Sequence, residues 1–428
     1  MLVILSDVHL TDGSSGTTID PRAFRKFSSL VKTVIGNPTE AKIRDVEIVL
    51  LGDIFDVIRS ETWLRDQNRR AAQPIRPWSK VTDKDSEGWN LEKYTNYIVD
   101  DIVNNPKNKE AIGYLDQLRE DCAKMNVKAT LSYLIGNHDW LINRYASTRG
   151  KIADLLSLPN KGIYAQQKFA WESIFTDYNV LARHGDCYDP FNYQGNRDDS
   201  SMGDGIVIDL LNHFPYAVRD SLGLEPDNEL VKQLKEIDNI RPLLDVPAWI
   251  HGVCQRTPLL EKAVHQVWND GLDKFFSIPF IESHSGANYL KMALELASQF
   301  SFVRLKEIMS HALVRNLYRE KDEYRRFAAE EQALKNNSVR YVIYGHTHVA
   351  DQVPLLALTN QSEPQVNKLY FNSGTWRKVF EHTICDKHDC HFIGWDVMTF
   401  VVFYLDEEKG KGRDYEVWSA SLGGYEKN

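Results

Sequence analysis

Seven residues with metal-binding side chains follow directly after five short apolar segments that are spread over most of the chain. Carboxylate oxygen, amide oxygen and imidazole nitrogen are the atoms with which proteins bind hard and borderline divalent ions. Seven ligands are too many for one ion but suit two ions that share a carboxylate, and Asp53, alone after its segment, is the predicted bridge. The sequence therefore predicts a dinuclear centre of Asp7, His9, Asp53, Asn137, His184, His346 and His348.

The chemistry that such a centre supports is hydrolysis. Two ions about 3.5 to 4 Å apart hold a hydroxide between them as the nucleophile, lower its pKa and bind the oxygens of a phosphate for in-line attack. We therefore expect hydrolysis of a phosphate ester or anhydride in a small or medium anionic substrate. Mn²⁺ is the expected native ion, with Fe, Zn and Ni as alternatives, and no other cofactor is expected.

His138 is the predicted catalytic acid. It follows the predicted ligand Asn137 on the same turn, so it could donate a proton to the leaving oxygen. Asp139 is predicted to orient this imidazole and to keep it protonated. Three further acidic residues close to ligands could support metal-bound imidazoles, although roles in turns and caps are equally expected for them: Asp12, Asp56 and Asp186.

The five apolar segments have the length and composition of buried parallel strands, over residues 1–6, 46–51, 130–135, 179–183 and 339–344. Polar residues at the carboxyl ends of such strands mark the place where open α/β folds have their sites. After His348 the strand-like segments are shorter, over residues 368–372, 397–405 and 415–419, which suggests mixed or antiparallel strands that complete a second sheet.

Composition excludes a disordered chain and a fibrous repeat protein. With 428 residues, 43% hydrophobic and 26% charged, the chain has the composition of a folded protein. The net charge of −9 makes a long nucleic acid an unlikely partner. Five scattered Cys favour a reducing compartment, and no apolar run approaches the roughly 18 residues of a membrane span, so we expect a cytoplasmic protein without a transmembrane segment. The sequence does not indicate an oligomeric state.

Two intervals are too long to be simple loops. Residues 57–110 are polar and are predicted to form an insertion with little core of its own. Residues 200–335 are mostly helical in pattern and are predicted to form a cap that selects the substrate. The expected domains are thus a core of residues 1–199 and 336–428 and a cap of residues 200–335.

The sequence resembles the calcineurin-like metallophosphoesterases in five motifs that occur in the order typical of that family: Asp7-Val8-His9, Gly52-Asp53, Gly136-Asn137-His138-Asp139, His184 and Gly345-His346-Thr347-His348. The resemblance implies an α/β fold with a four-layer α-β-β-α sandwich of two mixed sheets, here with a large helical cap insertion. It also implies one metal held by Asp7, His9, Asp53 and His348, and another held by Asp53, Asn137, His184 and His346.

A narrower resemblance is to the branch that contains the UDP-2,3-diacylglucosamine pyrophosphohydrolases. It includes Gly52-Asp53-Ile54-Phe55-Asp56 and Asn372-Ser373-Gly374-Thr375-Trp376. The sequence departs from that branch at His138, where the branch has Arg, and in its larger insertions. A nucleotide-sugar pyrophosphatase of the lipid A precursor type, a phosphodiesterase or nuclease, and a phosphoprotein phosphatase therefore stay open within the enzyme class.

Two alternatives come from other classes of function. The chain could be a partner-binding module with a vestigial metal site, although retention of His138 argues against a purely structural centre. Separately, Cys385, His388, Cys390 and His391 offer four donors for a structural zinc ion, and an incidental polar hairpin tip or redox pairing are the alternatives for that segment.

Overall fold

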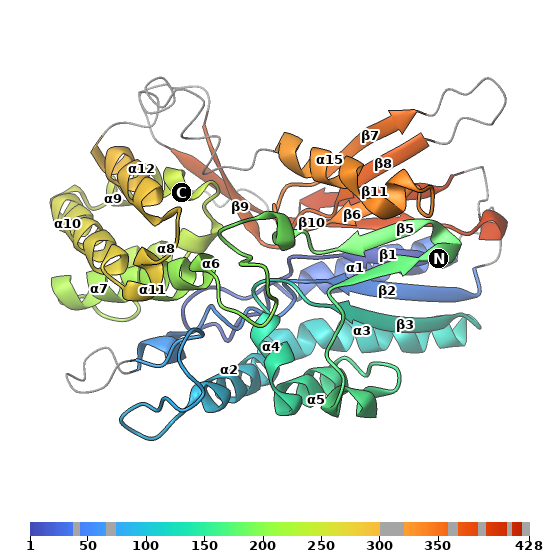
Figure 1. Ribbon diagram of the computed structural model, residues 1–428, viewed down its shortest axis with the longest axis horizontal. Helices are drawn as coiled ribbons and strands as arrows, with labels where there is room; N and C mark the ends of the chain where they lie inside the picture. Colours follow the sequence, from blue (N-terminus) through green and yellow to red (C-terminus); the bar gives the residue numbers. More distant parts are fainter. Residues whose placement is uncertain are drawn as a thin grey trace.

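Two mixed β-sheets form the centre of the protein in the computed structural model, which describes residues 1–36, 43–65, 74–299, 321–357, 367–383, 391–408 and 413–421 (Figure 1). The first sheet has, in spatial order, β11 (Tyr415–Ser421), β10 (Phe392–Phe403), β1 (Leu2–Leu5), β2 (Asp45–Leu51) and β3 (Lys128–Leu134), and β9 (Lys378–His382) pairs with β10. The second has β4 (Glu172–Phe175), β5 (Val180–Arg183), β6 (Tyr341–Tyr344), β8 (Asn367–Asn372) and β7 (Asp351–Ala357). The predicted mixed α/β architecture with two sheets is confirmed.

The strand register brings the carboxyl ends of the parallel strands together. In the first sheet Leu5 pairs with Leu50, and Leu51 pairs with Leu134, so β1, β2 and β3 end at one edge. In the second sheet β5, β6 and β8 are also parallel, with Tyr344 opposite Asn372. Loops that leave these strand ends therefore lie close together at the edge where α/β folds place their sites.

A hydrophobic core lies between the two sheets and explains their apolar sequences. Leu2 and Ile4 of β1 belong to the same buried cluster as Val180 of β5 and Ile343 of β6. Because side chains alternate along a strand, Val3 points to the opposite face and joins another cluster. The parallel strands are thus buried on both faces, which is why they appear as continuous apolar runs rather than as alternating patterns.

Helices cover the outer face of each sheet (Figure 1). The outer face of the first sheet packs with α1 (Arg22–Ile35), α2 (Leu91–Asn104), α3 (Pro106–Lys124), α4 (Trp140–Arg144) and α5 (Ala146–Leu155) in one large buried cluster. The second sheet packs with α15 (Lys321–Glu330) and α16 (Gln332–Lys335) through Tyr324, Ala328 and Leu334. Residues 321–335, the last part of the segment predicted to be a cap, therefore pack on the second sheet.

The other described helices after residue 200 gather at one end of the molecule (Figure 1). They have a hydrophobic core of their own, which includes Trp268 and Phe275 and is separate from the cores of the sheets. Phe275 and Phe276 are buried in it and pack against its other residues. The helices are α6 (Met202–Gly205), α7 (His213–Leu222), α8 (Glu229–Leu234), α9 (Val246–Cys254), α10 (Pro258–Phe276), α11 (Pro279–Glu282) and α12 (Ala287–Gln299).

The described residues of the segment 57–110, predicted to be a polar insertion with little core of its own, place their apolar side chains in the core of the first sheet. Trp63 and Ile75 are each 1% exposed and lie in the cluster that packs on the first sheet. Leu91, Tyr94 and Ile98 of α2 belong to the same cluster. The segment has a low average apolar content, because its apolar residues are spread among many charged ones. In α2 the apolar residues recur at helical spacing and form one buried face.

Two predictions concern residues that the structure does not describe. Cys385, His388 and Cys390 lie outside the described residues, as do residues 300–320 of the predicted cap. Among the helices that the structure does describe, none has the length and apolar character needed to cross a membrane.

Candidate metal centre

The seven predicted ligands converge at the carboxyl ends of five strands. Asp7 and His9 follow β1, and Asp53 follows β2. Asn137, His184 and the pair of His346 and His348 follow β3, β5 and β6. The first five of these side chains are at most 5% exposed, and the two last histidines are half-buried. Residues that are up to 341 positions apart in the chain (348 − 7) are thus brought to one place.

The backbone at this place is strained. Five of the seven residues have a positive φ between 52° and 67°, namely Asp7, His9, Asp53, His346 and His348. Residues other than glycine seldom adopt this conformation, which costs of order 1 to 3 kcal/mol each, and such residues cluster at functional sites. The repeated conformation turns each side chain out of its strand toward a common centre.

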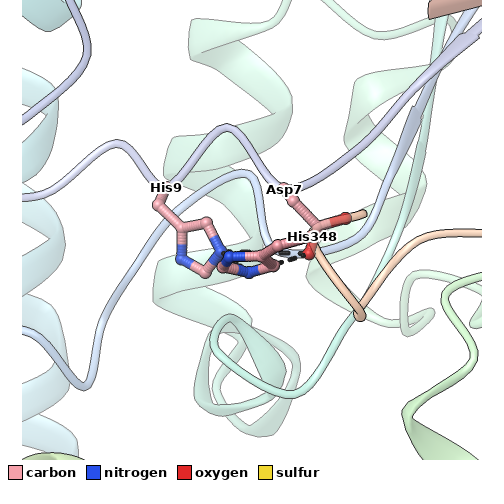
Figure 2. Close-up of side chains that lie close together, drawn as sticks. All are labelled: Asp7, His9 and His348. Carbon is pink, nitrogen blue, oxygen red and sulfur yellow. Dashed lines mark hydrogen bonds and ion pairs between the residues drawn. The ribbon is translucent and has the colours of Figure 1, made fainter. Parts of the chain in front are cut away.

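Asp7, His9 and His348 form the first group of potential ligands (Figure 2). His9 Nε2 is 3.1 Å from His348 Nε2, which is 3.3 Å from Asp7 Oδ1. On the other side of the ring, His9 Nδ1 donates a hydrogen bond to Asp56 Oδ2 at 2.9 Å. The neutral imidazole of His9 therefore keeps a lone pair on Nε2, directed at the group, as metal ligation requires.

Asp53, His184 and His346 form the second group. His184 Nδ1 donates to the carbonyl of Leu51 at 2.9 Å, which leaves Nε2 as the atom that faces the group. His346 Nδ1 is 3.0 Å from Asn137 Oδ1, so the amide oxygen that the sequence predicted as a ligand lies beside this group. All these donors are oxygen or nitrogen atoms of the kinds that first-row divalent ions prefer.

Asp53 lies between the two groups. Its Oδ2 is 3.9 Å from His9 Nε2 of the first group and 3.1 Å from His184 Nε2 of the second. Its Oδ1 accepts a hydrogen bond from the backbone N–H of His138 at 2.8 Å, which fixes the orientation of the carboxylate. This is the position that a carboxylate shared by two cations must occupy.

Two buried polar atoms of the centre have no hydrogen-bond partner in the described residues, Asp7 Oδ1 and His184 Nε2. Leaving a buried acceptor unsatisfied costs about 1 to 3 kcal/mol, and more for a charged group. A divalent cation between the donors would satisfy both atoms. The residues present therefore fit a metal ion, and buried Asp and His groups that could hold one are a property of this structure.

The pKa values of the centre describe its metal-free state. Burial would raise the pKa of Asp7, but the charge of His184 and the nearby ring of His348 outweigh it and lower the pKa to about 2. Burial would lower the pKa of His184, but the carboxylates of Asp53 and Asp7 raise it to about 10. A proton on His184 thus balances the buried carboxylates, and a bound cation must displace it, so metal binding is expected to release protons.

Two glycines allow the loops to approach the ligands closely. A Cβ on Gly136 would lie 2.7 Å from the backbone nitrogen of Asp53. A Cβ on Gly345 would lie 2.5 Å from Asp7 Oδ2. Both distances are too short for any other side chain, which is the physical reason for glycine before Asn137 and before His346.

Asp56, rather than Asp139, holds the imidazole of His138. His138 Nδ1 donates to Asp56 Oδ1 at 2.9 Å, while the other oxygen of Asp56 binds His9. Burial would lower the pKa of His138, but the carboxylates of Asp56 and Asp53 raise it to about 9, so the ring is protonated at neutral pH in the metal-free chain. One carboxylate therefore orients both a predicted ligand and the predicted acid.

The predicted role of Asp139 is wrong. Its Oδ1 accepts from the backbone N–H of Gly136 at 2.6 Å, and its Oδ2 accepts from the N–H of Ile54 at 3.1 Å and from the hydroxyl of Tyr133 at 2.6 Å. Asp139 thus ties the loop after β3 to the loop after β2. Neighbouring side chains on a tight turn diverge, and for this reason the carboxylate that orients His138 comes from another loop.

The two other acidic residues weighed as supports serve elsewhere. Asp12 accepts hydrogen bonds from Ser14 and Ser60, and Asp186 forms an ion pair with Arg197. The sequence reasoning missed Asp189, whose Oδ2 is 3.1 Å from His346 Nε2. In the sequence, Asp189 could be noticed only because it is acidic and follows His184 closely. Acidic residues so close to a predicted ligand are too common to be diagnostic.

Replacing Asp56 by asparagine is expected to weaken Mn²⁺ binding by about 10- to 100-fold, the usual effect of losing a partner that orients a ligating imidazole. The cause is loss of the carboxylate that fixes the His9 ring. Isothermal titration of the folded variant measures the affinity, and Asp12→Asn is the matched control because Asp12 contacts no histidine. An unchanged affinity in Asp56→Asn would contradict the role of Asp56.

A cavity of about 430 Å³ opens beside the centre. Asp53, Asn137, His138, His346 and His348 line one side of it. The other side comes mainly from apolar residues of the segment after residue 190, including Phe191, Ile206, Val207, Leu211, Leu243, Leu244 and Leu290. Asp238 and Arg241 add two charged groups to this lining.

Comparisons with known protein families, with curated proteins and with solved structures find no match to this chain.

Proposed function

We propose that this chain is a dinuclear-metal-dependent hydrolase of phosphoester or phosphoanhydride bonds. The observation that carries the proposal is the placement of the Asp53 carboxylate between two separate groups of buried His and Asp side chains. A structural site needs only one closed set of ligands, whereas two adjacent sets that share a carboxylate are the design of two-metal hydrolases.

The resemblance to calcineurin-like metallophosphoesterases belongs to the same proposal. Its support from the fold is the packing of α1, α2 and α3 on the outer face of the first sheet and of α15 and α16 on the second. Together with the core between the sheets, this packing supports the four-layer α-β-β-α sandwich that the resemblance implies. Its support from the site is that three members of each implied ligand set form one group of donors, Asp7, His9 and His348 in one set and Asp53, His184 and His346 in the other.

A bound pair of divalent ions would supply Lewis-acid activation of water and neutralisation of the phosphate charge. The side chains of the protein would hold the ions and donate the proton. Asp7, His9 and His348 would hold one ion, Asn137, His184 and His346 the other, and Asp53 both. Because Asp56 binds Nδ1 of His138, the proton for the leaving oxygen would be carried on Nε2 of that ring.

The segment of residues 200–335 is proposed to act as a cap over the centre. In support, residues of this segment line the same cavity as the predicted ligands. Their apolar side chains suit a substrate that carries an uncharged or aromatic group next to its phosphate. The net charge of the chain, −9, makes a long nucleic acid a poor candidate for that substrate.

Arg241 is the residue of the cap best placed to bind a substrate phosphate. It lines the cavity together with His348, and its side chain is 39% exposed. Its guanidinium hydrogen-bonds to the carbonyl of Ile240 at 3.2 Å and lies 3.7 Å from Asp238 Oδ1, so it is held in place before substrate binds. Because Arg241 and His348 line the same cavity, a phosphate bound at the centre would lie within reach of the guanidinium.

Replacing Arg241 by alanine is expected to lower kcat/KM about 10- to 100-fold, mainly through KM, since a hydrogen bond to a charged group contributes about 1.5 to 3 kcal/mol. Steady-state kinetics on the preferred substrate measure the change. Arg219→Ala is the matched control, because Arg219 lies in the same segment and pairs with Asp220. An unchanged KM in Arg241→Ala would remove Arg241 from the binding site.

The reaction class is tested with bis-p-nitrophenyl phosphate and p-nitrophenyl phosphate in the presence of Mn²⁺. The proposal predicts turnover of at least one of them, abolished by a chelator and restored by Mn²⁺. Hydrolysis of the diester alone would favour a phosphodiesterase, and turnover of the monoester a phosphatase. If metal-loaded protein hydrolyses neither of these nor a nucleotide-sugar pyrophosphate, the enzyme proposal fails and the partner-binding module is favoured.

A further inference from the structure

A second cluster of metal-binding side chains lies outside the candidate centre, on α9 and α10. It consists of His251, Glu261 and His265, whose ligand atoms all lie within 4.8 Å of one another. None of the three lines the cavity beside the centre. Figure 1 places both helices in the group at the far end of the molecule from the two sheets. The cluster is therefore separate from the proposed phosphoesterase site.

The helices bring the three side chains to one point. Glu261 and His265 are four residues apart on α10, so they project from the same face of that helix. His251 is in the last turn of α9, and only residues 255–257 connect the two helices. A short connection of this kind fixes the end of α9 beside the start of α10, which makes the cluster a preformed feature of the fold.

The distances suit a small cation. Glu261 Oε1 is 2.5 Å from His251 Nδ1 and 3.9 Å from His265 Nε2. Ligands at the about 2.0 to 2.2 Å bond lengths of a tetrahedral zinc ion lie roughly 3.3 to 3.6 Å from one another. The observed separations fall on both sides of that value, so small rotations of the side chains would complete the geometry.

The environment also favours a metal over a simple ion pair. Both imidazoles lie around the same carboxylate oxygen, whereas a simple ion pair needs only one of them. The side chains of His251, Glu261 and His265 are 44%, 29% and 25% exposed, which leaves an open side for entry and for water as a fourth ligand.

We propose that His251, Glu261 and His265 bind one Zn²⁺ or a similar first-row transition ion, which links α9 to α10 and stiffens the cap. Two imidazoles and one carboxylate are a known ligand set for zinc, with the fourth position left to water. The ion would join two helices that otherwise meet through apolar contacts and one hydrogen-bonded pair. This site is independent of the proposed hydrolase activity.

The test compares zinc uptake by the full-length protein and by a His251→Ala/His265→Ala variant, with elemental analysis after removal of loosely bound metal. We expect the variant to lose one equivalent relative to wild type and to lose part of the rise in thermal midpoint that added Zn²⁺ causes. The quantity compared is the difference in bound zinc between wild type and variant. Any metal at the Asp53 centre is present in both proteins and does not change that difference. His284→Ala is the matched control, because the ring of His284 bonds to the carbonyl of Phe280 and packs against the ring of that residue.

A variant that keeps the same zinc content and the same zinc-dependent rise in midpoint as wild type would overturn the proposal. Circular dichroism checks that the double variant is folded. If it is not, Glu261→Gln provides the same test with a smaller change, because the amide keeps the shape of the side chain and removes the charge that a cation needs. Equal zinc uptake by Glu261→Gln and wild type would also overturn the proposal.

Discussion

Replacing Asp53 by asparagine is expected to abolish hydrolysis and to weaken metal binding in both halves of the centre. The carboxylate lies between the two donor groups, with Oδ2 facing His9 on one side and His184 on the other. An amide offers one oxygen and no charge, so it cannot bridge two cations. The loss of affinity should exceed the about 10- to 100-fold that removal of an outer hydrogen-bond partner causes.

Elemental analysis and kinetics on the same preparation test the Asp53→Asn prediction. The result expected is fewer bound equivalents of Mn²⁺ together with a rate close to that of chelated wild type. Asp154→Asn is the control, because Asp154 is 67% exposed and pairs only with Lys161 on the surface. If Asp53→Asn keeps two equivalents of metal and a near-normal rate, Asp53 is not a bridge.

Replacing His138 by alanine is expected to lower kcat by about 10² to 10⁴ while the metal content stays unchanged, as for loss of a general acid. The reduction should be large for substrates whose leaving oxygen must take up a proton. It should be small for p-nitrophenyl phosphates, since nitrophenolate leaves without one. Kinetics on both kinds of substrate therefore separate proton donation from a general loss of structure.

The pH dependence of the rate gives a second measurement of His138. An acid acts in its protonated form, so the rate should fall as the pH rises through the pKa of His138, and His138→Ala should remove that fall. The pKa is about 9 in the metal-free chain because Asp56 and Asp53 outweigh burial, and cations bound at Asp53 would lower it. Loss of metal in His138→Ala would instead make His138 a ligand, since its ring lies in a donor group with His9 and Asp53.

The positions of the predicted ligands could be inferred from the sequence because each follows a buried parallel strand. Such strands are apolar on both faces, so a polar residue at their end is conspicuous, and parallel strands end at a common edge. The sequence could not provide the positive φ of Asp7, His9 and Asp53, which turns these side chains toward one another. It also could not show that one oxygen of Asp53, Oδ2, faces the imidazoles of both His9 and His184.

What the sequence could not predict has a common physical cause. Contacts between residues that are far apart in the sequence produce no pattern in the residues around either of them. Asp139 is next to His138 in sequence, but Asp56 from another loop binds that ring. The packing of α15 on the second sheet likewise has no mark in the sequence, because α15 belongs to the segment of residues 200–335 that is helical in pattern throughout.

A crystal structure of Mn²⁺-soaked protein, with anomalous scattering measured at the manganese edge, is the most direct test of the paired metal centre. We predict two anomalous peaks on opposite sides of the Asp53 carboxylate, one beside Asp7, His9 and His348 and the other beside Asn137, His184 and His346. A single peak, or peaks only at sites remote from Asp53, would contradict the dinuclear centre and the hydrolase function proposed from it.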